Sequence, residues 1–258
     1  MNKNYIRLAI AGINGRMGKS ILEILNNKVT KNISLNGVIE KLSNLKKKKT
    51  IIYKSNTLNI KSNLIDIIND FDVLIDFTNP ESTMKNLNIC KIYNKKIIIG
   101  TTGFNKKQKS IIKETSKNIS IILSSNFSLG INILLQILEK ITKIICKNNL
   151  KNSMDIDIIE KHHKNKIDSP SGTALSLKNI IIRTYKKFNI LKNIKCHSIR
   201  ASDLYGEHSI LFSFIGEQIE LIHNVSNRKP FAEGSIKAAI WIYKKPAGMY
   251  NMKHVLKI

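Results

Sequence analysis

Hydrophobic and polar positions in the first half of the chain follow two alternating patterns. Short apolar runs that stop at glycine or at polar turn residues are typical of buried strands, and apolar residues spaced three and four apart are typical of helices. The strands predicted in this way are 6–11, 35–39, 73–77, 96–99 and 119–123. The helices predicted between them are 20–26, 64–69, 82–93 and 110–116. Strands that alternate with helices predict an α/β fold with a doubly wound parallel sheet.

The second half of the chain follows a different pattern. The helices predicted there are 131–147, 171–187 and 234–243, and a half-exposed strand is predicted over 154–160. Two further runs, 208–214 and 218–223, alternate on either side of Gly216, which is typical of an antiparallel hairpin. We therefore expect three parts: a first domain over 1–128, an inserted α+β domain over 129–235, and a C-terminal segment over 236–258 that returns to the first domain.

The first predicted strand leads into a glycine-rich loop in the stretch AIAGINGRMG. Gly12, Gly15 and Gly18 follow the pattern G-x-x-G-x-x-G between a strand and a helix. Glycine lets the backbone approach a pyrophosphate, and the N-terminus of the following helix stabilises its charge. The loop therefore predicts that the first domain is Rossmann-like and binds a dinucleotide.

Two charged residues follow the second predicted strand. Glu40 lies where an acid would bind the adenosine ribose hydroxyls of a dinucleotide. Lys41 beside it is suited to a ribose 2′-phosphate. A solvated loop is the alternative for both residues. Glu40 favours NADH and Lys41 keeps NADPH open, so the sequence does not choose between the two coenzymes.

Polar turns also follow three later strands. They are Thr78 to Pro80, Gly100 to Gly103 and Ser124 to Ser128. Each alone is ordinary turn chemistry. In open α/β sheets, however, ligands bind beyond the carboxyl ends of the strands, so the three turns together predict a cofactor cleft.

The richest chemistry lies in EKHHKNKIDSPSGTA, which begins at Glu160. His162 and His163 are adjacent, so on a strand they point to opposite faces, and Lys166 follows after a short bend. Histidine exchanges protons near neutral pH, and the helix that opens at Gly172 and Thr173 offers backbone amides to a carboxylate. The stretch predicts a site for a small dianionic substrate that needs a proton. A polar surface loop is the alternative, and a metal site is not expected because no carboxylate–histidine triad has the usual spacing.

Composition narrows the classes of protein only slightly. The 258 residues are 42% hydrophobic and carry a formal net charge of +25. The lysines are spread along the whole chain with few aromatic residues, which favours coding bias over a nucleic-acid site. Cys90, Cys146 and Cys196 are far apart and predict reduced thiols rather than disulfides. Neither a signal peptide nor an apolar run of roughly 18 residues is present, so we expect a soluble, cytoplasmic protein.

The motifs together resemble the 4-hydroxy-tetrahydrodipicolinate reductase (dihydrodipicolinate reductase) family of lysine and diaminopimelate biosynthesis. The resemblance covers nearly the whole chain: IRLAIAGINGRMG, DFTNPE, IIIGTTGF, SSNFSLGIN, E-x-H-H-x-x-K-x-D-x-P-S-G-T-A, YGEHSILF and HNVSNRKPFAEGSIKAAIW. It implies that a hydride from the nicotinamide reduces a cyclic substrate with loss of water, giving tetrahydrodipicolinate. It also implies a homotetramer joined through the sheet of the substrate domain.

The resemblance also implies a role for each matching residue. His162 resembles the family's proton donor and acceptor, and Lys166 its proton donor. Substrate carboxylates would be held by His163, Gly172 and Thr173. NADH or NADPH would be contacted by Gly12, Ile13, Asn14, Gly15, Arg16, Met17, Glu40, Gly100, Thr101, Thr102, Ser124, Ser125, Asn126 and Phe127.

The chain departs from the family pattern at two places. The family usually carries a longer loop between Cys196 and Tyr205, which bears on the tetramer and on closure of the substrate site, and Lys161 replaces a residue that is often small. Three alternatives to an active reductase follow from the sequence: a weakened family member, a basic polyanion-binding protein on a Rossmann scaffold, and a semialdehyde dehydrogenase. The last needs a nucleophilic cysteine, and none of the three cysteines lies at the expected site.

Overall fold

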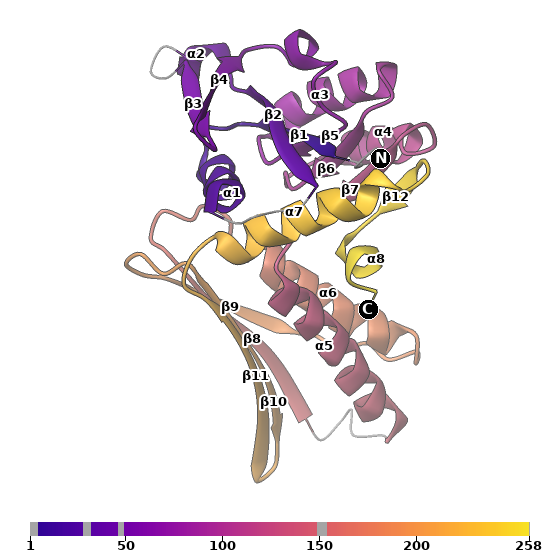
Figure 1. Ribbon diagram of the computed structural model, residues 1–258. Helices are drawn as coiled ribbons and strands as arrows, with labels where there is room; N and C mark the ends of the chain where they lie inside the picture. The colour runs from indigo at the N-terminus through magenta and orange to yellow at the C-terminus, as the bar shows by residue number, and fades with distance from the viewer. Residues whose placement is uncertain (1–4, 28–31, 46–48, 149–153, 258) are drawn as a thin grey trace. The chain divides into compact units, whose positions relative to one another are not determined.

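The computed structural model describes residues 5–27, 32–45, 49–148 and 154–257, which form two compact units (Figure 1). The first unit contains residues up to 128 together with 229–257, and the second contains 129–228. The expected return to the first unit at residue 236 is seven residues too late, because one continuous helix, α7, makes the return and begins at Lys229. A helix packs as a whole on its sheet, so its first two turns belong to the first unit as well.

The first unit is built on one twisted sheet, which confirms the predicted α/β class. Its strands are β1 (Ile6–Ala11), β2 (Ile33–Ile39), β3 (Thr50–Tyr53), β4 (Asn56–Lys61), β5 (Val73–Asp76), β6 (Lys96–Ile99), β7 (Ser120–Leu123) and β12 (Gly248–Tyr250). Their order is β12-β7-β6-β5-β1-β2-β4-β3. All neighbours are parallel except β3 and β4, so the sheet is mixed at one edge rather than wholly parallel.

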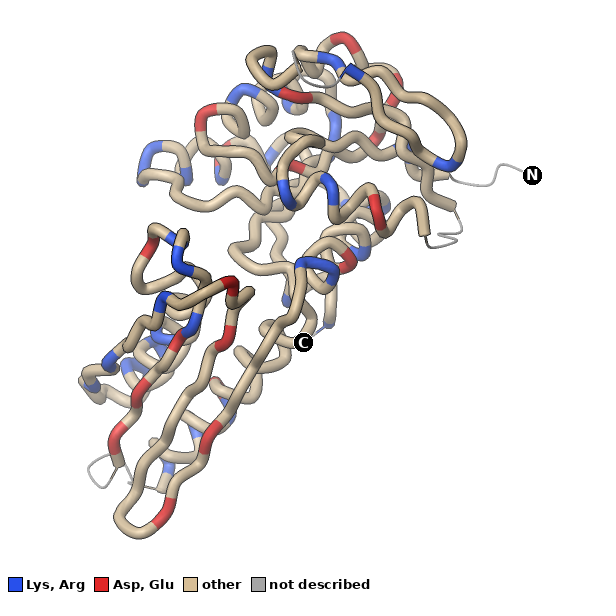
Figure 2. Tube along the Cα trace, turned by 90° about the vertical axis from the view of Figure 1, so that its left-hand side faces the viewer, with Lys and Arg blue, Asp and Glu red and all other residues tan. Residues whose placement is uncertain are grey.

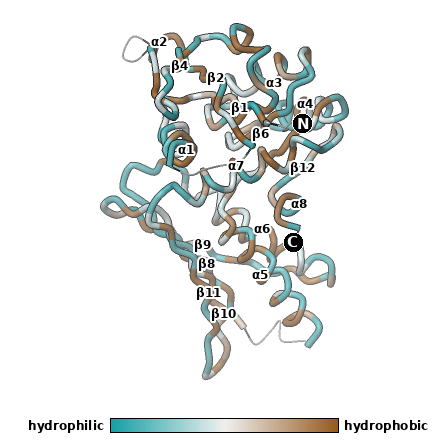
Figure 3. Tube along the Cα trace, viewed as in Figure 1, coloured by the Kyte–Doolittle hydropathy of each residue, from teal (hydrophilic) through white to brown (hydrophobic). Residues whose placement is uncertain are grey.

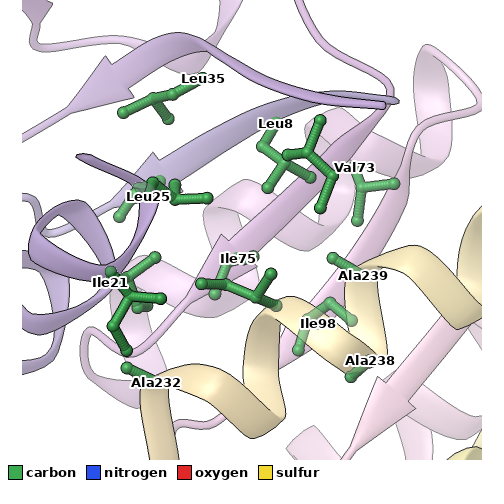
Figure 4. Packing of buried hydrophobic residues seen from close by; sticks show 14 of the residues in the cluster. Leu8, Ile21, Leu25, Leu35, Val73, Ile75, Ile98, Ala232, Ala238 and Ala239 are labelled. Atoms are coloured by element: carbon green, nitrogen blue, oxygen red, sulfur yellow. The ribbon is translucent and has the colours of Figure 1, made fainter. Parts of the chain in front are cut away.

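Helices cover both faces of this sheet. They are α1 (Arg16–Asn27), α2 (Leu42–Leu45), α3 (Pro80–Ile92), α4 (Lys106–Thr115), α7 (Lys229–Tyr243) and α8 (Met252–Leu256), with a 3-10 turn η1 (Leu64–Ile67) in place of the helix expected over 64–69. Successive residues of a strand point to opposite faces. On β5, Val73 and Ile75 therefore pack with α1 and α7, as Figure 4 shows, whereas Leu74 packs with α3 and α4.

The second unit is a four-stranded sheet with two helices. Its strands are β8 (Met154–His162), β9 (Lys195–Arg200), β10 (Gly206–Phe214) and β11 (Glu217–Val225), in the order β11-β10-β8-β9. The helices are α5 (Leu129–Lys147) and α6 (Gly172–Lys186). Only β8 and β9 are parallel to each other. Polar and apolar residues interleave along these strands (Figure 3). Their apolar side chains pack with both helices.

Helix α7 lies close to the first sheet because its inward residues are small. Ala232, Ala238 and Ala239 are fully buried. At Gly234 a Cβ would come within 1.8 Å of the carbonyl oxygen of Phe127, which is backbone and has little room to move. The absence of a side chain at this position therefore sets the distance between the helix and the loop after β7.

The substitution Gly234→Ala is expected to destabilise the protein, although Ala normally stabilises a helix relative to Gly. Overpacking against the Phe127 carbonyl should lower the free energy of unfolding by about 1–3 kcal/mol. Urea unfolding measures it, and Lys237→Ala, at an exposed position of the same helix, is the matched control. An unfolding free energy for Gly234→Ala that equals or exceeds the wild-type value would contradict the close packing.

Candidate active site

The turn between β1 and α1 has the backbone shape that the glycine pattern predicts. Gly12 has φ +76°, and a Cβ there would lie 3.0 Å from Cγ2 of Thr78. At Gly18 a Cβ would lie 2.4 Å from the carbonyl oxygen of Gly12, so the helix packs directly on the turn. Both positions need glycine, and the turn brings backbone amides to the carboxyl end of β1.

Glu40 fastens this turn to the end of β2. Its buried carboxylate accepts hydrogen bonds from the backbone N–H of Asn14 (2.9 Å), the N–H of Lys41 (2.9 Å) and the side-chain amide of Asn44 (3.1 Å). A residue predicted to bind ribose therefore also holds the shape of the glycine loop. It lies in a position to do both, because its side chain also lines the cavity beside the loop.

That cavity has a volume of about 1000 Å³ and lies beyond the carboxyl ends of β1, β2 and β5. Gly12, Asn14, Gly15, Glu40 and Lys41 line it, as the sequence predicts for cofactor-binding residues. Its wall is completed by the segment before η1 and by the first turns of α3. An elongated polar ligand such as a dinucleotide fits a cleft in this place.

The other predicted cofactor residues do not line this cavity. Ile13 and Phe127 are buried in the core, where Phe127 packs edge-on to Phe77, and Met17 packs against the same core. Arg16, Thr102 and Ser125 are exposed. The remaining predicted positions are Gly100, Thr101, Ser124 and Asn126, all in turns that follow β6 and β7.

Asp76, which the sequence did not single out, organises the turns after β5 and β6. Its fully buried carboxylate accepts hydrogen bonds from Thr78 (2.6 Å), Asn86 (2.9 Å) and Thr83 (3.2 Å). The Thr83 hydroxyl also lies within hydrogen-bond distance, 2.9 Å, of the Thr101 hydroxyl. The predicted cofactor residue Thr101 is thus held by a hydrogen-bond network that begins at the end of β5.

In the second unit, strand alternation decides which histidine is buried. One face of β8 packs with the helices, and it carries Met154, Ile156, Ile158, Glu160 and His162. His163 follows the end of the strand and is partly exposed. The apolar stripe of the strand thus ends in an acid and an imidazole that the fold buries.

Burial controls the chemistry of the His162 imidazole. It lowers the pKa from 6.5 to about 4, although attraction to the Glu160 carboxylate opposes this effect. The Nδ1 atom of His162 lies 3.4 Å from Oε2 of Glu160. In the protein without substrate, His162 is therefore neutral at pH 7, beside a carboxylate that favours a proton on the ring.

The loop after β8 supplies the other predicted residues. Lys166 forms an ion pair of 2.6 Å with Asp168. Ser171 caps α6, since its Oγ accepts a hydrogen bond of 3.1 Å from the N–H of Ala174. No described atom lies within 4 Å of the position that a Cβ on Gly172 would take. The space beside Gly172 at the start of α6 is thus unfilled, whereas the backbone N–H of Gly172 is hydrogen-bonded to the Asp168 carboxylate.

The fold also assembles a carboxylate–histidine group that sequence spacing did not reveal. Ligand atoms of Glu160, His162 and His208 all lie within 4.8 Å of one another, and all three residues are buried. Sequence spacing does not reveal the group because His208 comes from β10 and reaches it through strand register rather than through sequence proximity.

Comparison with known proteins fits both units. The family model described as dihydrodipicolinate reductase, N-terminus, matches residues 6–127, and the model of the C-terminus matches residues 130–256. The chain belongs to the dihydrodipicolinate reductase family.

Individual relatives agree with this assignment. The 4-hydroxy-tetrahydrodipicolinate reductase of Wigglesworthia glossinidia brevipalpis is 46% identical over 97% of this chain and 93% of its own length. That of Buchnera aphidicola subsp. Baizongia pistaciae is 42% identical over the full length of both chains. Among solved structures, the dipicolinate-bound dihydrodipicolinate reductase of Paenisporosarcina sp. TG-14 superimposes with a TM-score of 0.74 at 24% identity, covering 96% of this chain and 97% of that one.

A likeness to another enzyme class is limited to the fold. Aspartate semialdehyde dehydrogenase II from Vibrio cholerae gives a TM-score of 0.56 at 12% identity, covering 90% of this chain and 96% of that one. Cys90 and Cys146 of this family member are buried, and burial raises the pKa of the Cys90 and Cys196 thiols. Among the described residues, Cys90 and Cys196 thus lack the lowered pKa of a nucleophilic thiol, and Cys146 is buried.

Three polar residues of the second unit were missed as members of the site. Arg200 and His208 come from strands far along the chain, and Glu160 was noted only as the first letter of a motif. One signal for Glu160 was present: it continues the every-second-residue stripe of β8, where an acid in an apolar position indicates a buried, paired carboxylate.

The buried histidines are expected to make the fold sensitive to acid. Burial lowers the pKa of His208 to about 3 and of His162 to about 4, whereas both take up protons near pH 6.5 when unfolded. The unfolded chain therefore binds more protons below pH 6.5, so the free energy of unfolding is highest above this pH and falls as the pH drops towards 4.

In His208→Gln the loss of unfolding free energy between pH 7 and 5 should be about 1–2 kcal/mol smaller than in the wild type. Urea unfolding at both pH values measures it, and the difference between the two proteins at pH 7 gives the packing cost of the substitution separately. An unchanged pH dependence would show that His208 titrates alike in the folded and unfolded chain.

Proposed function

We propose that the protein catalyses the NADH- or NADPH-dependent reduction of (2S,4S)-4-hydroxy-2,3,4,5-tetrahydrodipicolinate to tetrahydrodipicolinate, with loss of water. The reaction takes up one hydride from the reduced nicotinamide and one proton. The observation that carries the proposal is the second-unit site, where a buried histidine lies at the end of β8, next to the lysine-bearing loop that leads to the N-terminus of α6. The two relatives that match over nearly all of this chain are named 4-hydroxy-tetrahydrodipicolinate reductase, after this reaction.

In this proposal the residues of the second unit bind the substrate and move its proton. Gly172 and Thr173 hold one carboxylate at the N-terminus of α6, where the helix dipole favours a negative charge. His163 binds the second carboxylate. A bound dianion favours protonation of His162, whose pKa burial has lowered, and His162 and Lys166 then supply the proton.

His162→Gln should lower kcat by about 100-fold or more, the usual contribution of a general acid, with the fold retained. The assay follows NADPH or NADH oxidation while dihydrodipicolinate synthase generates the substrate from pyruvate and aspartate semialdehyde. His197→Gln, on the exposed edge of the same sheet, is the control and should keep wild-type turnover. A His162→Gln enzyme with wild-type kcat would remove His162 from the mechanism, and a wild-type protein without turnover would favour a weakened family member.

In the first unit, we propose that the dinucleotide binds in the cavity beside the glycine loop. The turn from Gly12 to Met17 contacts the pyrophosphate through its backbone amides, since the side chains of Ile13 and Met17 pack in the core. The turns Gly100 to Thr102 and Ser124 to Phe127 face the nicotinamide half, with the Phe127 ring in the core. The Glu40 carboxylate accepts hydrogen bonds from the ribose hydroxyls of NADH, and the exposed Lys41 forms an ion pair with the 2′-phosphate of NADPH. Both coenzymes are then accepted, because neither residue excludes the other's partner.

Lys41→Ala should raise the KM for NADPH roughly 3- to 10-fold and leave the KM for NADH nearly unchanged, because only NADPH carries the 2′-phosphate. Lys19→Ala, at another cation that lines the cavity, is the control and should affect both coenzymes alike. If the NADPH-to-NADH ratio of kcat/KM stays at the wild-type value in Lys41→Ala, the 2′-phosphate binds elsewhere.

The proposal includes the assembly of the subunits. We propose a homotetramer joined through the outer face of the second-unit sheet, where Ile199 and Ile222 are 43% and 59% exposed. Light scattering of the purified protein gives its mass directly.

A polyanion-binding function is not favoured, because Lys and Arg are spread over most elements of both units (Figure 2). In the described part of the chain, no helix is long and apolar enough to cross a membrane.

A further inference from the structure

Strand register in the second unit builds a polar row across a buried sheet face. Ser198 on β9, Glu160 on β8, His208 on β10 and His223 on β11 are cross-strand neighbours. Neighbours of this kind share one face of the sheet. Glu160 is fully buried on this face and His208 is 5% exposed. A charge in such a place is stable only if its oxygens are paired.

The two carboxylate oxygens of Glu160 are used differently. Oε1 accepts hydrogen bonds from the N–H of Ser171 (3.0 Å), the hydroxyl of Ser198 (2.6 Å) and the guanidinium of Arg200 (2.7 Å). These bonds outweigh the cost of burial and lower the pKa of Glu160 to about 2. Oε2 is buried and, among the described residues, has no hydrogen-bond partner. One oxygen is thus saturated with donors while the other is left for a further one.

The free oxygen points at the His162 imidazole. Oε2 lies 3.4 Å from Nδ1 of His162, a buried nitrogen that likewise has no hydrogen-bond partner within the described structure. His208 is 3.8 Å from the same oxygen, and its Nε2 already lies 3.2 Å from Oγ of Ser171. A small rotation of the ring would therefore join Nδ1 to Oε2.

The other ring nitrogen of His162, Nε2, lies next to Gly206, which has no side chain to cover it. A Cβ on Gly206, at the start of β10, would come within 3.2 Å of Nε2 of His162. The ring itself is held edge-on against His208, with centroids 5.1 Å apart and planes at 76°. Nδ1 thus faces a fixed carboxylate, and Nε2 faces the side where glycine has left space.

We propose that Glu160 is a positioning residue that fixes His162 in the tautomer with its resting proton on Nδ1, so that Nε2 carries the proton exchanged in the reaction. The inference rests on the proposed role of His162 as proton donor. During transfer the Nε2–H bond breaks, the proton passes to the substrate, and the ring returns to the neutral Nδ1–H form. Solvent then supplies the next proton to Nε2.

A metal ion is the competing use of the same group. Glu160, His162 and His208 could draw together around a cation, since their ligand atoms already lie within 4.8 Å of one another. The guanidinium of Arg200 is bound to the same carboxylate, and the positive charges of Lys166 and Arg200 act on the same imidazole. A divalent ion would have to enter against these cations, so the geometry favours the proton on Nδ1.

Glu160→Gln tests the proposal because the donors around residue 160 determine which way the glutamine amide is oriented. Three donors converge on Oε1, so the amide oxygen must take that place and the NH₂ group must replace Oε2. The NH₂ then donates to Nδ1 of His162, which forces the ring into the opposite tautomer, with its proton on Nε2. A substitution that adds no volume thus reverses the predicted tautomer.

The measurement is ¹⁵N NMR of histidine-labelled protein, with the His162 signals assigned among the six histidines by their loss in His162→Gln. The wild type should show Nδ1 protonated and Nε2 bare, and Glu160→Gln should show the reverse. Asp157→Asn, which alters an exposed carboxylate–histidine pair with His197 in the same sheet (2.7 Å), should leave the His162 signals unchanged. The same His162 tautomer in wild type and Glu160→Gln would overturn the proposal.

Kinetics and a second variant separate positioning from a general loss of structure. Glu160→Gln should lower kcat at least tenfold with little change in the substrate KM, whereas Glu160→Asp, which keeps a carboxylate, should keep the wild-type tautomer and recover part of kcat. If Glu160→Gln fails to fold, an Nε2-protonated His162 in Glu160→Asp would overturn the proposal by itself. Stoichiometric Zn²⁺ binding to the wild type that Glu160→Gln abolishes would overturn it too.

The NMR result is independent of turnover. A protein with no turnover in the coupled assay whose His162 tautomer reverses in Glu160→Gln would refute the proposed reaction and support the positioning of His162. Normal turnover with an unchanged tautomer would do the opposite.

Discussion

A buried carboxylate at the end of β8 is the constraint on which the second unit depends. Glu160 is fully buried, and an unpaired charge there would cost several kcal/mol. Its donors come from the first residues of α6 and from β9, so satisfying one oxygen fixes a helix start and an edge strand at once. The start of α6 and the His162 ring are therefore held relative to each other by one group.

The first unit uses the same device at the ends of its parallel strands. Asp76 at the end of β5 holds the turns that contain Thr78 and Thr101, and Glu40 after β2 holds the glycine loop through the N–H of Asn14. Loops at this edge must present backbone amides to a ligand, so they cannot pack many apolar side chains. Buried acids replace that packing with hydrogen bonds, which fix loop shape and leave the surface polar.

The fold was predicted from apolar runs in the sequence, so the strands that lack such a run were not predicted. Strands β1, β5 and β6 are mostly apolar and were predicted, whereas β9, in the sequence KCHSIR, has polar residues at four of its six positions and was missed. His162 and Lys166 follow from a local motif. His208 and Arg200 do not, because strand register brings them to Glu160 from positions 48 and 40 residues away.

The short connection after β9 shows why a reduced loop is compatible with an assembled site. Strand β9 runs parallel to β8 and ends beside His162, while β10 begins on the opposite side of β8. The residues between them, 201–205, must therefore cross the end of β8. They do so with backbone hydrogen bonds from Ala201 to the carbonyl of His162 (2.9 Å) and from Lys164 to Ser202 (3.2 Å). A direct crossing of this kind thus ties residues 201 and 202 to the end of β8, at His162, by backbone hydrogen bonds alone.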